Sequence, residues 1–170
     1  RSLTSFNSVN RLVAVEETLY VATDGGLLLI GDPEQPARAF TNADGLGISA
    51  ISDGTVDDSG RIWLVGQGRL IRFDGAASKS WPFEDEDGQA IRLNSVTDDG
   101  EWLWIGAETG LVLFSKSIDG GQIQDSYGRF GNLSDFPSVN EAMLSGDSIW
   151  IATDAGIAAA EASDRRLLKQ

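Results

Sequence analysis

Polar side chains recur at two fixed positions along this chain, and their types could recognise a polar ligand. Each position occurs four times, at spacings of 43, 41 and 46 residues. One set is Asp24, Gln67, Glu108 and Asp154, and the other is Asn10, Asp53, Asn94 and Asn140. Carboxylates and carboxamides gathered at one end of a fold could hydrogen-bond sugar hydroxyls or hold a cation. We predict both sets as ligand-binding residues; the alternative is that Asp and Asn in tight turns bond their own backbone.

The composition removes several classes of chemistry. The chain contains neither Cys nor His, so a Ser-His-Asp or Cys-His nucleophile and a zinc site with His or Cys ligands are excluded. Paired carboxylates such as Asp24 and Glu108 could still serve a glycosidase as acid and nucleophile, and we keep this as an alternative. We expect a protein that is not an enzyme and that uses no cofactor and no metal.

The charge of the chain argues against nucleic acid as a partner. Asp and Glu number 26 against 13 Lys and Arg, which gives a net charge of -13, whereas phosphate binding needs a basic face. The densest acidic run, residues 84–88, resembles half a calcium loop but lacks the distal Glu, and we interpret it as a solvated loop. No apolar run is long enough to span a membrane. The first residues lack the apolar stretch of a signal peptide, which a mature or excised segment could have lost.

The polar sets are positioned by an internal repeat built around an aromatic residue. In each copy an aromatic is followed by small residues, a turn and a return into apolar residues. The four copies are residues 20–27, 63–70, 104–111 and 150–157, headed by Tyr20, Trp63, Trp104 and Trp150. A repeat of about 40 residues that contains short strands is typical of a β-propeller. A large ring at one fixed place per unit is expected in the core between stacked sheets.

Each repeat is predicted to form one four-stranded antiparallel blade. Alternating apolar residues mark the strands, and Gly-containing turns such as Asp24-Gly25-Gly26 mark the hairpins between them. The second-to-third turn and the connection into the first strand share one end of a blade, so both polar sets should lie there. The predicted blades are approximately residues 8–41, 48–83, 92–130 and 138–168.

The repeat resembles that of the two-component regulator propellers. The third unit carries the pattern best, with Asn94, Asp98-Asp99-Gly100, Leu103-Trp104-Ile105-Gly106 and Gly110-Leu111. In the first unit Tyr20 replaces Trp, and in the fourth Ala152 replaces the second Gly. The resemblance implies a periplasmic or extracellular sensing module of bacterial origin that binds an oligosaccharide or another polar ligand, or else a surface protein that serves assembly or secretion.

The number of blades leaves the form of the ring open. Outer-strand candidates occur at both ends, at residues 2–6 and 165–168, although a closed four-blade ring needs only one. We therefore consider a closed ring of four blades, a part of a larger ring, and a ring completed by a second copy. Open strand edges favour self-association. The segments 130–137 and 40–48 are our candidates for partner contact.

Overall fold

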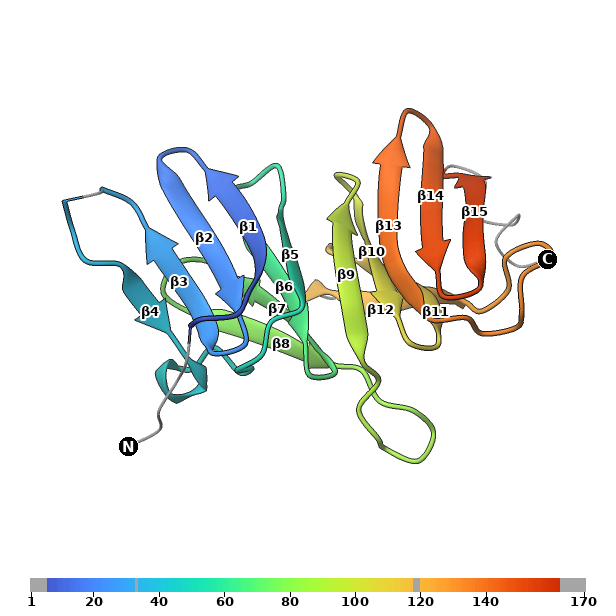
Figure 1. Cartoon of the computed structure of the whole chain (residues 1–170), viewed down its shortest axis with the longest axis horizontal. Helices are drawn as coiled ribbons and strands as arrows, with labels where there is room; N and C mark the ends of the chain where they lie inside the picture. Colours follow the sequence, from blue (N-terminus) through green and yellow to red (C-terminus); the bar gives the residue numbers. More distant parts are fainter. Residues whose placement is uncertain (1–5, 33, 118–119, 163–170) are drawn as a thin grey trace. The chain divides into compact units, whose positions relative to one another are not determined.

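The computed structural model describes residues 6–32, 34–117 and 120–162, and these form an all-β protein. Antiparallel strands make four separate sheets, which we call blades 1 to 4 (Figure 1). The strands of blades 1 and 2 are β1 Val9–Val15, β2 Thr18–Thr23, β3 Gly26–Ile30, β4 Arg38–Phe40, β5 Asp53–Val56, β6 Ile62–Gly66, β7 Arg69–Phe73 and β8 Ser78–Pro82. The strands of blades 3 and 4 are β9 Leu93–Asp98, β10 Trp102–Ala107, β11 Gly110–Ser115, β12 Gln122–Tyr127, β13 Val139–Ser145, β14 Ser148–Thr153 and β15 Gly156–Glu161.

Within each blade the strands follow one another in chain order, so every connection is a hairpin. Blades 1 to 3 have four strands each, and blade 4 has three among the described residues. The two predicted outer strands, 2–6 and 165–168, lie outside the described residues except for Phe6, and the predicted blade limits stay predictions. A 3-10 helix, η1 (Asn42–Asp44), leads from blade 1 toward blade 2. The described residues include no helix with the length and apolarity needed to cross a lipid bilayer.

Glycine at the second-to-third turn is required by the outer strand of the blade. Gly26 and Gly110 adopt φ values of 127° and 128°, which side-chain-bearing residues rarely adopt. A Cβ atom there would lie 2.3 Å from the Phe40 carbonyl oxygen in blade 1 and 2.2 Å from the Tyr127 carbonyl oxygen in blade 3. The turn therefore fits against the end of the outer strand only when its residue has no side chain.

The chain divides into two compact units, Arg1–Ala90 and Ile91–Gln170, each containing two blades and a core of its own. In the first unit, Val13 and Leu27 of blade 1 pack with Leu64 and Ile71 of blade 2. In the second unit, the core joins one face of blade 3 to one face of blade 4. Its buried residues are Trp102, Trp104, Leu111, Leu113, Tyr127, Phe130, Val139, Ala142, Ile149 and Ile151. Neither blade of a unit could bury these side chains alone.

The repeat aromatics meet different surroundings. Trp63 and Trp104 are fully buried, as predicted, and Tyr20 is partly buried against the core of the first unit. The prediction of a core position is wrong for Trp150, which is 43% exposed. Its strand neighbours Ile149 and Ile151 face blade 3, so the alternation of the strand directs Trp150 to the opposite face of blade 4.

Candidate functional site

Several carboxylates at the first-to-second turns are committed to the fold. Asp57 accepts hydrogen bonds from the backbone N–H groups of Ser59 and Arg61 and, at 2.8 Å, from the indole N–H of Trp63. Asp99 binds the Trp104 indole in the same way at 2.8 Å. These carboxylates fix the repeat aromatic to the turn beside it, and their acceptor capacity is used within the blade.

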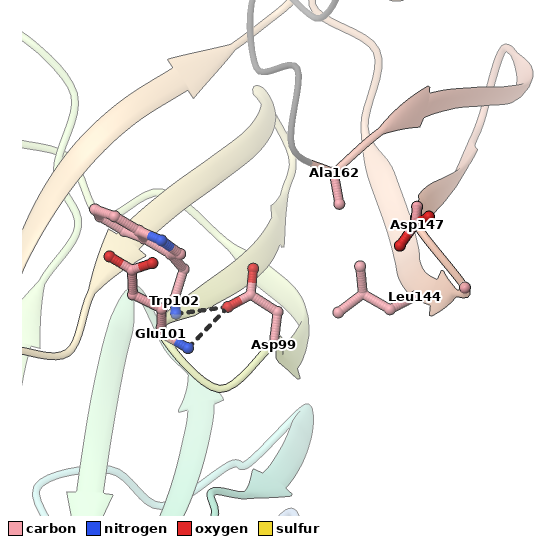
Figure 2. A pocket seen from close by; sticks show the side chains of 7 residues that line it. Asp99, Glu101, Trp102, Leu144, Asp147 and Ala162 are labelled. Carbon is pink, nitrogen blue, oxygen red and sulfur yellow. Dashed lines mark hydrogen bonds between the residues drawn. The ribbon is translucent and has the colours of Figure 1, made fainter.

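The same end of the second unit carries a shallow pocket of about 310 Å³ (Figure 2). Asp99 lies on one side of it, and Leu144, Asp147 and Ala162 of blade 4 lie on the other. One oxygen of Asp99 accepts the backbone N–H groups of Glu101 and Trp102, as Figure 2 shows. The pocket is therefore formed around a structural turn, at the opposite end of the blades from the predicted ligand-binding residues.

The first predicted set occupies the second-to-third turns of the four blades. In three blades the side chain accepts a hydrogen bond from the segment that enters the same blade. Gln67 Oε1 accepts from the Ser49 N–H at 2.9 Å, and Glu108 Oε1 accepts from the Arg92 N–H at 2.8 Å. Asp24 accepts from Ser8 and from the Asn10 amide, and the bond from Asn10 contributes most to lowering the pKa of its carboxyl. Among the described residues, Asp154 makes only a backbone contact, from its N–H to the Ser138 carbonyl.

The second predicted set lies at or beside the start of each first strand, where three of its members contact a neighbouring blade. The Asn10 amide donates to the Ile51 carbonyl of the next blade at 2.8 Å. The Asn94 amide donates to the Val139 carbonyl, also at 2.8 Å and also in the next blade. Asp53 forms an ion pair of 3.2 Å with Arg11 of the preceding blade. Asn140 is exposed, and its side chain makes no hydrogen bond within the described part of the chain.

Four polar groups at this end of the blades remain available to a ligand. All four belong to exposed residues, and no described residue hydrogen-bonds to them. They are Gln67 Nε2, Glu108 Oε2, the Asp154 carboxylate and the Asn140 side chain. Together they offer hydrogen-bond donors and acceptors. The second unit supplies three of the four, and within that unit Asn140 and Asp154 both belong to blade 4.

An aromatic side chain that the sequence did not single out is presented at the same end of the second unit. Phe136 is 63% exposed and has a φ of 52°, an uncommon conformation for a residue with a side chain. Its N–H donates to the Gly128 carbonyl at 2.5 Å, and its ring lies so close to Gly128 that a Cβ there would approach it to 2.3 Å. It precedes by two residues Ser138, the acceptor of the Asp154 N–H.

The two segments predicted for partner contact differ in their exposure. Phe136 lies in the segment 130–137, and its exposed ring suits that role. In the segment 40–48, however, Leu46 and Ile48 belong to the core of the first unit, and Phe40 packs against the Phe73 ring at 4.9 Å. A partner would reach the exposed residues 42–45 and Gly47 of that segment, but not its buried apolar side chains.

The sequence matches no protein-family model and no curated protein. Its fold, in contrast, is similar to that of several solved structures. The extracellular domain of the hybrid two-component system protein BT4673 from B. thetaiotaomicron has 17% identity, a TM-score of 0.76, and coverage of 95% of this chain and 22% of that one. The corresponding domain of BT3049 from the same organism has 16% identity, a TM-score of 0.72, and coverage of 96% and 22%.

A third similar structure is PorZ, a surface component of the type-IX secretion system of Porphyromonas gingivalis. It has 15% identity and a TM-score of 0.72, and the match covers 98% of this chain and 22% of that one. The chain spans about a fifth of the length of these three proteins. These structures confirm the predicted fold: the chain consists of antiparallel β-propeller blades.

Proposed function

We propose that this chain is a non-catalytic binding module of a periplasmic or extracellular sensor, and that its ligand is a glycan or a similar polar molecule. The proposal rests on polar side chains that lack hydrogen-bond partners among the described residues, above all Asn140 and Asp154 in blade 4. They lie at the end of the blades that carries the second-to-third turns, which we call the turn end. Similarity of fold to the extracellular domains of two-component system proteins supports the sensing role.

The chemistry of these groups suits a molecule rich in hydroxyls. A sugar hydroxyl both donates and accepts, so it can bind the Asp154 carboxylate and the Asn140 carboxamide. The exposed ring of Phe136 offers an apolar surface on which the C–H face of a sugar can lie. A polar rim beside a rigid aromatic is a common design for binding such ligands.

The environment of Asp24 does not suit the general acid of a glycosidase. A glycosidase needs one carboxylic acid whose pKa is raised, so that it holds a proton for the leaving group. Hydrogen bonds from Asn10 and Ser8 instead lower the pKa of the Asp24 carboxyl. Glu108 is held by the Arg92 N–H in a turn, as a structural acceptor would be.

A second candidate function is that of a surface protein in assembly or secretion. The similarity to PorZ, which extends over 98% of this chain, favours it. In that case the propeller blades would bind a protein, and the turn end would have no small ligand. The two candidates therefore differ in whether mutation of the turn end changes binding to glycans.

Glycan binding can be measured directly on an array and then by calorimetry with the best ligand. Asn140→Ala and Asp154→Ala should each weaken binding about tenfold, which corresponds to the loss of one or two hydrogen bonds. Phe136→Ala should weaken it by a similar factor. Asp147→Ala is the matched control, because Asp147 is an exposed acid at the other end of blade 4 and should leave binding unchanged. Binding that survives all three changes would contradict the site, and no binding to any glycan would favour the secretion candidate.

A further inference from the structure

We propose that the face of blade 4 that carries Trp150 binds blade 1 of a second copy of this chain, in the way that blade 3 binds blade 4 within the second unit. We call this surface the open face of blade 4; strand pairing places Glu141, Ala152 and Ile157 in one row of it and Met143, Trp150 and Ala159 in the next. This inference shares one residue, Asn140, with the proposed glycan site, and the variants that test it lie outside that site.

Exposed large apolar side chains are concentrated at two places in the molecule. The described residues include eight of them, and three lie on the open face of blade 4: Met143, Trp150 and Ile157. Three others, Val9, Leu12 and Ile30, belong to blade 1. Contiguous apolar patches on a soluble protein mark interaction sites.

The open face of blade 4 is equivalent, by position in the repeat, to the face of blade 3 that packs against blade 4. In blade 3, Trp104 packs into the core shared with blade 4, and the Asn94 amide donates to the Val139 carbonyl. Trp150 and Asn140 occupy the same repeat positions in blade 4, each 46 residues further along. Both are exposed, so the side chains that would bind a following blade are present and have no such partner among the described residues.

Blade 1 offers the surface that such a face binds. Val139, Ala142, Ile149 and Ile151 are the residues that blade 4 buries against blade 3. The equivalent residues of blade 1, each 130 positions earlier, are Val9, Leu12, Leu19 and Val21. Pairing of Leu12 with Val21, and of Val9 with Thr23, places Val9, Leu12 and Val21 on one face of blade 1, which we call its leading face. Val9 and Leu12 are exposed on this face, whereas Val21 is buried.

The contacts between blades 3 and 4 in the second unit predict the contacts between two copies. Trp150 would form a core with Leu12 and Leu19, as Trp104 shares a core with Ala142 and Ile149. The Asn140 amide would donate to the Val9 carbonyl, which holds the position of the Val139 carbonyl. Because the two surfaces are different, the interface is heterologous and joins copies head to tail.

The mass of the protein in solution tests this interface. Sedimentation equilibrium over a range of concentrations should give a mass that rises to at least two chains of 18.2 kDa. Trp150→Glu, on the open face, and Leu12→Glu, on the leading face, should each weaken association at least a hundredfold. An equimolar mixture of these two variants should regain a mass of two chains, because each variant keeps the surface that the other has lost.

Ile123→Glu is the matched control, since Ile123 is 47% exposed on the outer strand β12 and belongs to neither surface. It should associate like the unaltered chain. Circular dichroism checks that each variant is folded, and Met143→Glu replaces Trp150→Glu if the latter is not. A single-chain mass at every concentration would overturn the proposal. So would loss of association in the Trp150 variant alone, or a mixture that stays monomeric, since either result would mean that the leading face of blade 1 is not the partner.

Discussion

Asp57 shows how one side chain can set the position of a whole strand. Its two oxygens join the turn of Asp57–Gly60 to the indole of Trp63, and its side chain is only 1% exposed. Asp99 makes the same connection to Trp104. In blade 4 the equivalent of Asp99 is Ser145, which is too short to reach an indole in this way. The exposed Trp150 thus also lacks the carboxylate that anchors its counterparts.

Replacement of Asp57 should destabilise the protein in a pH-dependent manner. Burial alone raises the pKa of the Asp57 carboxyl, but hydrogen bonds from Trp63, Arg61 and Ser59 together lower it below its ordinary value. A lowered pKa in the folded state means that the stabilisation is complete above the unfolded value of about 3.9 and is lost as the pH falls through the folded value. Asp57→Asn should therefore reduce the free energy of unfolding by roughly 1–3 kcal/mol at pH 7 and by less in acid.

Urea denaturation at several pH values measures this difference. Asp58→Asn is the control, because Asp58 is the exposed neighbour of Asp57 and should have little effect at any pH. An Asp57 variant whose stability deficit is the same at pH 7 and in acid would show that the charge of the carboxylate does not matter.

At the scale of the element, the blades are joined by a carboxamide at the start of the first strand. Asn94 illustrates this role, and Asn140 is the same residue type at the same repeat position without a bound blade. Asn94→Ala should lower the free energy of unfolding by about 1–2 kcal/mol, because the Val139 carbonyl loses its side-chain donor. Asn140→Ala should change it by less than about 0.5 kcal/mol. Equal effects of the two changes in dilute solution would refute a joining role for Asn94.

The strands and hairpins of a blade could be predicted because they depend on local sequence. Alternation gives a strand its two faces, and Gly26 and Gly110 mark turns that only glycine can make against the outer strand. The surroundings of Trp150 could not be predicted in the same way. The repeat shows that its side chain faces the next blade, but it does not show whether a next blade is there.

The candidate site was predicted only in part for a related reason. Position in the repeat correctly placed the turn residues at one end of each blade. It did not distinguish Glu108, which accepts a hydrogen bond from the Arg92 N–H, from Asp154, whose carboxylate has no hydrogen-bond partner in the described part of the chain. That difference depends on the path of the segment that leads into the first strand of each blade, and this path is not the same in all four repeats. The presentation of Phe136 by Gly128 likewise depends on one connection that occurs once.

At the scale of the whole molecule, the acidic segment 84–90 connects two units that each have a core of their own. Its residues are exposed, and the Asp85 carboxylate orders it by accepting the N–H groups of Asp87 and Gln89. A Glu-specific protease should therefore cut first after Glu84 or Glu86. Both fragments should keep their β-sheet circular dichroism, because each retains a complete pair of blades.

Mass spectrometry of the early digest identifies the first cut. The double variant Glu84→Gln and Glu86→Gln should resist cleavage in this segment without any change in the spectrum of the intact protein. An early cut inside a blade, or fragments that unfold as soon as they form, would show that the two units are not stable separately.

The exposure of Trp150 also gives the protein an optical reporter. An indole in contact with water emits at longer wavelengths than a buried one and is reached readily by a dissolved quencher such as acrylamide. Trp63, Trp102 and Trp104 are buried, and Trp81 is partly exposed. In a Trp81→Phe variant a quencher should therefore distinguish Trp150 from the remaining indoles without any attached dye. A shift of the quencher-accessible emission to shorter wavelengths would then show that a ligand or a partner covers Trp150.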